Sequence, residues 1–435
     1  MAIKISGSTI IDDSRNIVNA GVVTATSFSG DGSALTDVGL YADTDLNIFS
    51  ANTCSGCNLN GSSACFNVFL GACTGKSTDV GYGNVFIGKC AGRDNTTGLS
   101  NNFIGFAAGR NNIGGSNNNF FGSYAGLSNE TGIHNIFIGQ NAGRLSESAN
   151  YNTFLGFEAG CSNTSGAFNI AIGPQAGKSN TTGCSNNFIG RCAGKTNTEG
   201  YENNFLGFCA GFSNTTGSRN VFIGRCVGAA NTTGSDNIFL GHDAGRGNTS
   251  GVNNTFIGRY AGRLNTSGDN NTFLNQNAGL NNITGVKNNF IGMNAGMGNT
   301  TGSCNNMIGV GAGQCATVTG LHNTFLGTFA GKCASGAGRD NNFFGYYAGY
   351  CNTIGSNNNF TGKCAGKCNT TGCFNNFIGM YAGIGNTTGC CNNMIGRGAG
   401  QCANITGDKN TFIGTYAGKC ASGAGGCNNF IGLCA

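Results

Sequence analysis

The chain has 435 residues, of which 79 are glycine and one is proline; 9% are charged, and the formal net charge is +5. So much glycine and so little charge are unusual for a globular enzyme. Disorder is also disfavoured, because disordered chains combine few aromatic residues with high charge, whereas this chain has 31 phenylalanines and a 39% hydrophobic fraction.

Residues 1–50 are predicted to be a β-rich segment that attaches to another protein. They are acidic overall, and their start, Met1 to Ser6, lacks the apolar core of a secretory signal. The sequence contains no run of about 18 apolar residues, so no membrane insertion is expected. Residues 51–66 are predicted to be a transition, and residues 67–435 a shaft of repeats.

The shaft is built on the signature Asn-x-Phe-Ile-Gly-x-x-Ala-Gly, whose first glycine we call the anchor. Anchors recur mostly every 17 residues, with a few steps of 18, which gives 22 repeats. Each position of the repeat is numbered relative to the anchor, which is position 0. The anchors are Gly71, Gly88, Gly105, Gly122, Gly139, Gly156, Gly173, Gly190, Gly207, Gly224, Gly241, Gly258, Asn275 in place of glycine, Gly292, Gly309, Gly327, Gly345, Gly362, Gly379, Gly396, Gly414 and Gly432.

Each repeat is predicted to be one coil of an all-β solenoid. Short apolar runs bounded by Gly and Asn are typical of strands, and one repeat alone cannot bury its phenylalanine. We expect a strand before each anchor, a second short strand after it, and a turn at Asn-Thr-Thr-Gly. The asparagine at position −4 is expected to form an axial amide ladder. The predicted core and ladder residues are Asn84, Phe86, Ile87, Gly88, Ala91, Gly92, Asn101, Phe103 and Gly105.

Phe and Ile are adjacent in each predicted strand, so their side chains should point to opposite faces. If Phe fills the coil, a column of Ile and Leu runs along the outside and requires a partner. A parallel homotrimer would bury it. A bend at the anchor could instead turn both side chains inward, which leaves a single-chain solenoid as the alternative.

The 23 cysteines fall in columns on the predicted coils. Coils about 4.8 Å apart lie within the Cα separation that a disulfide allows. Axial or interchain disulfides and unpaired packed thiols are both open readings. A metal site at Cys54-x-x-Cys57 with Cys65 has less support, because no histidine accompanies it. The candidate disulfide columns contain Cys73, Cys90, Cys192, Cys209 and Cys226 at position +2, and Cys315, Cys333, Cys351, Cys368, Cys402 and Cys420 at position +6.

Basic residues also form columns, at positions +1 and +5. They could contact anionic surface polysaccharide, or simply keep the rod soluble, which is the reading the sequence favours. Nucleic-acid binding is disfavoured, because these edges are expected to lack interleaved aromatic residues and the excess charge is small. The candidate surface-contact residues are Arg93, Arg110, Arg144, Lys178, Lys195, Arg246 and Arg263.

No catalytic constellation or cofactor motif stands out, so no enzyme activity and no cofactor are expected. The Asn-Thr-Thr-Gly column has the form of a glycosylation sequon, and threonine columns can bind ice or carbohydrate. The adjacent glycine favours a turn over a flat binding face. The chain ends in mid-repeat at Ala435, where we expect either a longer chain or a stacked partner.

Residues 3–38, with Asn19-Ala-Gly-Val-Val-Thr-Ala-Thr-Ser-Phe-Ser-Gly-Asp-Gly32, resemble a segment of virion structural proteins from marine, cyanobacterial-type bacteriophages. The repeats resemble, more loosely, the β-roll heads of trimeric autotransporter adhesins. These resemblances imply a homotrimeric tail-fibre shaft, N-terminal attachment to other virion proteins, and contact with a host surface receptor. The predicted location is the virion, outside the cell. A single-chain surface-binding solenoid or an extracellular filament subunit is the alternative.

Overall fold

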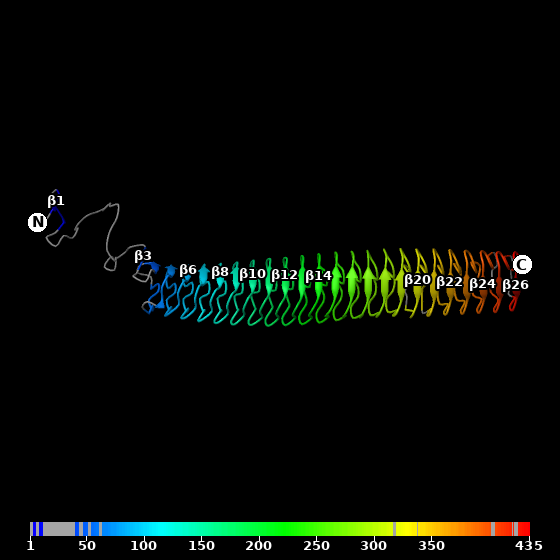
Figure 1. Ribbon diagram of the computed structural model, residues 1–435, viewed down its shortest axis with the longest axis horizontal. Helices are drawn as coiled ribbons and strands as arrows, with labels where there is room; N and C mark the ends of the chain where they lie inside the picture. The colour runs from blue at the N-terminus through cyan, green and yellow to red at the C-terminus, as the bar shows by residue number, and fades with distance from the viewer. Residues whose placement is uncertain are drawn as a thin grey trace.

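The computed structural model describes residues 3–5, 8–11, 40–42, 47–50, 54–60, 63–315, 319–336, 338–401, 405–419, 421 and 425–435. From β4 onward these residues form a long rod of stacked coils with one strand per coil (Figure 1). The strands are β1 (Ile3–Ile5), β2 (Ser8–Ile11), β3 (Leu40–Ala42), β4 (Ile48–Ser50), β5 (Val68–Leu70), β6 (Val85–Ile87), β7 (Asn102–Ile104), β8 (Asn119–Phe121), β9 (Ile136–Ile138), β10 (Thr153–Leu155), β11 (Ile170–Ile172), β12 (Asn187–Ile189), β13 (Asn204–Leu206), β14 (Val221–Ile223), β15 (Ile238–Leu240), β16 (Thr255–Ile257), β17 (Thr272–Leu274), β18 (Asn289–Ile291), β19 (Asn306–Ile308), β20 (Thr324–Leu326), β21 (Asn342–Phe344), β22 (Asn359–Thr361), β23 (Asn376–Ile378), β24 (Asn393–Ile395), β25 (Thr411–Ile413) and β26 (Asn429–Ile431).

The strands from β4 to β26 pair in chain order as one parallel ladder, which confirms the predicted β-solenoid. The register is strict: Phe86 pairs with Phe103, and Phe103 with Phe120. At the N-terminal end of the ladder, β3 pairs antiparallel with β4. β1 and β2 form a separate antiparallel pair. The parallel ladder therefore begins within the predicted N-terminal segment. Most of residues 1–50, including residues 12–39, lies outside the described residues.

The expected second strand after each anchor is wrong, because these residues form a turn. Gly88 has φ +125°, Cys90 +60° and Gly92 +55°, so three of five successive residues have positive φ. This left-handed backbone bends the chain away from a strand. Glycine is favoured at the anchor, since a Cβ on Gly88 would lie 2.5 Å from the carbonyl oxygen of Gly105; Asn275, with φ +100°, is the exception.

The core is a column of phenylalanine rings along the rod axis. Phe86 and Phe103 are fully buried, and their rings stack 4.8 Å apart at an interplanar angle of 6°. The alanine at position +3, such as Ala91, fills the remaining space and is also fully buried. Where Ala171 replaces phenylalanine, the neighbouring Phe188 is tilted by 31° against Phe205. Each coil alone would expose its ring, so core burial requires stacking.

The asparagine at position −4 forms the predicted axial ladder. Asn84 donates from Nδ2 to Oδ1 of Asn67 (3.1 Å), and its backbone N–H donates to the same oxygen (2.9 Å). Its Nδ2 also donates to the carbonyl of Gly98 at 3.0 Å. The side chains of Asn67 and Asn84 are fully buried. Each amide is therefore satisfied only by its own and neighbouring coils, as a buried polar group requires.

The ladder also reaches back before the predicted shaft. The backbone N–H of Asn67 donates to Oδ1 of Asn47 at 2.8 Å, and the ring of Phe49 lies 6.0 Å from that of Phe69. Asn47-Ile48-Phe49 is thus a first, irregular occurrence of Asn-x-Phe. It lies 20 residues before Asn67 and therefore does not follow the repeat of 17 or 18 residues.

A second buried ladder, which the sequence analysis missed, is formed by the asparagine at position +7. Asn112 donates from Nδ2 to Oδ1 of Asn95 at 2.7 Å and to the carbonyl of Gly115 at 2.9 Å. These asparagines begin the Asn-Thr-Thr-Gly segments, and their side chains point inward and are fully buried.

The second ladder is interrupted at Ser146. Among the described residues, neither Oδ1 of Asn129 nor the hydroxyl of Ser146 has a hydrogen-bond partner, although both are buried. In the same coil Ala149 replaces the usual glycine. In the preceding coil a Cβ on the corresponding Gly132 would collide with Oδ1 of Asn129. Ala149 and a ladder asparagine therefore compete for the same space, which explains why serine accompanies alanine.

We expect the double substitution Ser146→Asn with Ala149→Gly to restore the ladder and stabilise this coil. The regained hydrogen bonds exceed the entropic cost of glycine, for a net gain of roughly 1 kcal/mol. Hydrogen exchange followed by mass spectrometry should show slower exchange of the amides around residue 146. Ser146→Asn alone should speed that exchange, because Ala149 remains. If the two single substitutions were simply additive, the proposed competition would be wrong.

Candidate functional surfaces

The outer face of the parallel sheet carries the predicted apolar column. Ile104 is 37% exposed and Leu155 is 42% exposed, while the adjacent phenylalanine of each strand is buried. The anchor therefore does not turn both side chains inward. We call the outer face of the strands the sheet face. Beside it, at position +1 of the turn, Phe106, Phe157 and Phe208 are each between 43% and 45% exposed.

The polar residues of the sheet face are satisfied along the rod. At position −3, Asn102 donates to Oδ1 of Asn119 at 2.8 Å, and Asn187 to Oδ1 of Asn204 at 2.6 Å. A partner that covered the sheet face would leave these bonds intact, so burying the amides would cost less than burying unpaired ones.

The cysteine columns place thiols on successive coils. The 21 described cysteines are free thiols; Cys402 and Cys420 lie outside the described residues. Cys192, Cys209 and Cys226 occupy the same turn position, with φ between 53° and 58°. Burial, together with the neighbouring thiols of Cys192 and Cys226, raises the pKa of Cys209. Disulfide formation in these columns stays a prediction.

The second column, at position +6, is similarly crowded. Burial raises the pKa of Cys351, and the thiols of Cys368 and Cys333 raise it further. A hydrogen bond with Cys333 is the main reason why the pKa of the Tyr350 hydroxyl rises to about 12. The raised pKa of Cys351 favours the protonated thiol, which is the form that does not bind metal ions.

One pair of sulfurs in contact lies where the rod begins. Cys57 donates from Sγ to Sγ of Cys54 across 2.7 Å. Burial and this hydrogen bond raise the pKa of Cys57 to about 11. In the described part of the chain, no three His, Cys, Asp or Glu side chains are grouped as a metal site would require.

The candidate basic residues differ in their surroundings. Arg93 forms an ion pair with Asp94 at 2.6 Å, and Lys178 with Glu158 at 2.7 Å. The hydrogen bond from Lys178 lowers the pKa of Glu158. Arg246 lies 3.5 Å from the carboxylate of Asp243. Several basic residues in the first part of the rod are therefore neutralised by adjacent acids.

Arg263 lies beside the same carboxylate as Arg246, at 3.9 Å from Asp243. Lys195 lies over the ring of Phe212. Arg110 donates to Oδ1 of its neighbour Asn111, and Arg144 is exposed in the turn of its coil. Together with Arg93, Lys178 and Arg246, these residues lie along one edge of the rod, the turn edge. The structure thus brings the predicted basic column together as an edge rather than as a pocket.

The expectation that the turn edge lacks aromatic residues is wrong. Tyrosine and phenylalanine occupy position +2 in many coils, between the basic positions +1 and +5. Tyr260 is an example, since the guanidinium of Arg259 lies 4.6 Å from its ring centroid and that of Arg263 lies 5.2 Å away. The sequence signal was present, but position +2 was assigned to cysteine alone.

The threonines at position +8 form an ordered column beyond the turn edge. From Thr164 to Thr266, the hydroxyl of each coil donates to a carbonyl of the next coil at 3.0 to 3.1 Å. Each threonine hydroxyl proton is therefore used within the protein, and the chain bends at these threonines after the turn of the coil.

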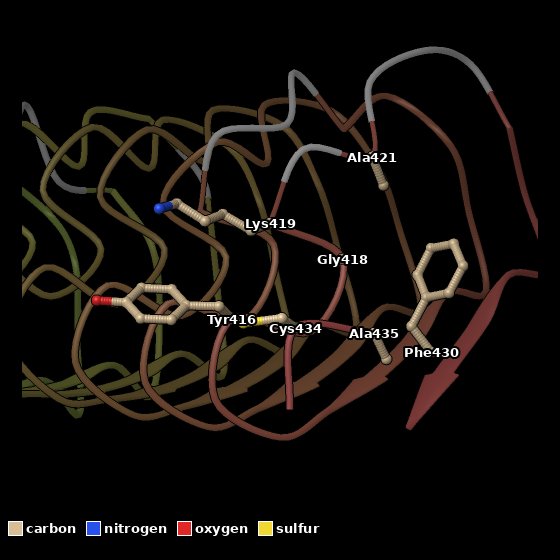
Figure 2. Close-up of a pocket in the computed structure, with 7 residues that line it drawn as sticks. All are labelled: Tyr416, Gly418, Lys419, Ala421, Phe430, Cys434 and Ala435. Carbon is tan, nitrogen blue, oxygen red and sulfur yellow. The ribbon is translucent and has the colours of Figure 1, made fainter. Parts of the chain in front are cut away.

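A pocket of about 430 Å³ lies at the last coil (Figure 2). It is lined by Phe430, whose ring stacks at 5.1 Å on that of Phe412, and by Ala421. Figure 2 shows Tyr416 and Lys419 extending along the same side of the coil, apart from Phe430. This space corresponds to the interior that the next ring fills in other coils, so we assign it no ligand.

No helix that could cross a membrane is present among the described residues.

We expect Cys209 to react slowly with iodoacetamide at pH 8 in the folded protein. Its pKa lies above the ordinary value of 9.0, and only the thiolate is nucleophilic. The rate should therefore keep rising as the pH is increased beyond 9. Peptide mass spectrometry gives the rate, with the exposed Cys304 as an internal reference. Equal rates for the two thiols in the folded protein would contradict this account.

We also expect Cys54 and Cys57 to form a disulfide when the protein is treated with diamide, because their sulfurs are already in contact. The peptide that contains both should lose the mass of two hydrogen atoms. Cys54→Ser should abolish this change and leave Cys57 open to alkylation. Recovery of both residues as free thiols after diamide would show that the contact does not support pairing.

Comparison with known proteins adds no functional information. No model of a protein family matches the chain, and no curated protein matches it either. The features of the protein that bear on its function are therefore the surfaces of the rod: the sheet face, the turn edge and the cysteine columns.

Proposed function

We propose that the protein is a structural and adhesive fibre, the shaft of a bacteriophage tail fibre that mediates attachment to a host surface. The observation that carries this proposal is the apolar column of the sheet face, which runs along a rod of stacked coils and is interrupted at Thr361. A rod of 22 coils at about 4.8 Å each is roughly 105 Å long. A shaft needs length, stiffness and a means of assembly, and the fold supplies candidates for all three.

The size of the sheet face supports assembly into a parallel homotrimer. A strip about 105 Å long and about 10 Å wide has an area near 1,000 Å². Stable interfaces bury about 800 Å² on each partner, and apolar patches of this size are rare on monomers. Parallel copies would match because every coil repeats the same face at the same rise.

The remaining parts of the proposal rest on the sequence. The resemblance of residues 3–38 to phage virion proteins supports attachment of the N-terminus to other virion proteins and an extracellular location. No enzyme activity and no cofactor are proposed, because the surfaces described above are columns rather than a cleft with convergent reactive groups. Neither nucleic-acid binding nor membrane insertion is part of the proposal.

A single-chain surface-binding solenoid is the second candidate, and the threonine column favours it. Seven successive threonine hydroxyls from Thr164 to Thr266 are held in one orientation, a regularity that an ordered surface such as ice or glycan could match. This reading requires no trimer. The native mass therefore separates the two candidates.

Light scattering of the purified protein, with and without reductant, should give the mass of three chains of 44.1 kDa each. Dissociation by reductant would indicate that the cysteine columns join chains. A one-chain mass in both conditions would contradict the trimer and favour the single-chain solenoid.

The substitutions Ile223→Thr, Leu240→Thr and Ile257→Thr, made together, should weaken the trimer without unfolding the coils. Thr361 stands at the same position in β22, so threonine is compatible with the strand. Sedimentation velocity should show smaller species at the same protein concentration. Ile113→Thr with Ile283→Thr removes exposed apolar groups at position +8, off the sheet face, and should leave the mass unchanged. Unchanged assembly of the triple variant would mean that the sheet face is not the interface.

A further inference from the structure

Positive charge and aromatic rings occur together on the turn edge in the last part of the rod. Around Tyr260, two guanidinium groups lie within 5.2 Å of the ring centroid. At Tyr416 the ammonium of Lys419 lies 4.6 Å from the ring centroid (Figure 2 shows both side chains). A cation over an aromatic ring is held in a defined place, and both groups remain partly exposed.

The coils anchored at Asn275, Gly292 and Gly309 have neither a cation nor an aromatic ring at positions +1, +2 and +5, and the pattern resumes at Gly327. Lys332 lies 4.6 Å from the ring centroid of Phe329, and Lys367 lies 5.4 Å from that of Tyr347. Tyr346, at position +1 of the same coil as Tyr347, is 45% exposed. We call positions +1, +2 and +5 of the coils from Arg259 to Lys419 the basic–aromatic strip.

The acidic residues of this region are segregated away from the strip, although Asp243 of the preceding coil lies 3.9 Å from Arg263. From Arg259 to the end of the chain, positions +1 to +6 contain no aspartate or glutamate. The three acidic residues of that region, Asp269, Asp340 and Asp408, stand five or six residues before an anchor, on the opposite side of the strand. In the first part of the rod, by contrast, acids such as Asp94 and Glu158 neutralise the same columns.

We propose that the basic–aromatic strip binds an acidic polysaccharide that lies along the rod. Cations would pair with carboxylate or sulfate groups, tyrosine rings would contact the apolar faces of the sugar rings, and tyrosine hydroxyls would bond sugar hydroxyls. This inference deepens the proposed attachment role by naming the ligand class, and it depends on that role only for its biological setting.

A polysaccharide fits the strip better than single-stranded nucleic acid does. The strip carries fewer than one cation per coil, whereas nucleic acid has a phosphate on every nucleotide. The residues between the cations are often amides or hydroxyls, including Gln276, Asn277 and Thr328. Such groups form the hydrogen bonds that sugar hydroxyls require.

The native sequence supplies conservative substitutions for a test. Glutamine stands at position +1 in Gln276 and at position +5 in Gln314 and Gln401, and asparagine stands at position +2 in Asn277 and Asn294. A charge variant therefore combines Arg259→Gln, Arg263→Gln and Lys419→Gln. A ring variant combines Tyr260→Asn, Tyr381→Asn and Tyr416→Asn, and asparagine also tolerates the positive φ of these positions.

The control variant removes three cations from the opposite edge, with Lys287→Asn, Arg339→Ser and Lys409→Asn. These side chains are exposed, and asparagine or serine occupies the same positions in other coils. The control and the charge variant have the same net charge. A difference between them therefore reports where the charge lies rather than how much there is.

Binding of the full chain to immobilised polygalacturonate should be measured by surface plasmon resonance, with neutral dextran and poly(dT) as comparison probes. We expect the charge variant to bind roughly tenfold more weakly, because three exposed charge contacts are lost. The ring variant should weaken binding several-fold, and the control by less than about twofold. Neutral dextran should not compete with polygalacturonate.

The inference would be overturned by any of three results: no binding to polygalacturonate, equal loss in the charge and control variants, or tighter ring-dependent binding to poly(dT). Light scattering of the same samples reports the oligomeric state. If the protein is a trimer that does not bind polygalacturonate, the binding proposal is wrong and the trimeric fibre stands. If it is a monomer that binds polygalacturonate, the binding proposal stands and the trimeric fibre is contradicted.

Discussion

The structure depends on one constraint, which is that each buried asparagine must find its partners on adjacent coils. Asn84 uses its amide and its backbone N–H on a single oxygen of Asn67, and gives its second amide proton to the turn that closes its own coil. An unpaired buried amide costs about 1–3 kcal/mol, and the cost recurs at every coil. Slippage of the coils by even one residue would break all of these bonds, so the register is fixed.

Fixed register has a consequence for the surface of the rod. Every position of the repeat stands directly above the same position of the next coil, so any residue preference becomes a column. The apolar sheet face, the cysteine columns and the turn edge all arise in this way. The composition of each column, rather than a local cluster, therefore carries the functional information. A face repeated along the whole rod suits assembly, and an edge that changes composition along the rod suits a localised contact.

The period made the solenoid, the Phe86 core and the Asn84 ladder predictable, because a strict repeat of Asn, Phe and Gly leaves few ways to bury a ring. The second strand was wrongly predicted, since periodicity says nothing about the positive φ of Cys90. The inner ladder of Asn95 was missed because Asn-Thr-Thr-Gly is also good turn chemistry. The signal was that this asparagine persists in coils where the following residues change, as in Asn112-Ile113 and Asn129-Glu130. The sequence shows which coils carry acidic residues on the turn edge, but the ion pairs that they form, such as that of Glu158 with Lys178, depend on side-chain placement.

The mass per unit length of single particles, measured by scanning transmission electron microscopy, tests the central claim most directly. The account holds that the sheet face is buried between parallel copies, so three chains should share each length of rod. One coil of about 17 residues would then be present three times in every rise of about 4.8 Å. A mass per length of a single chain would contradict the account, because the apolar face would then be exposed to water along the entire rod.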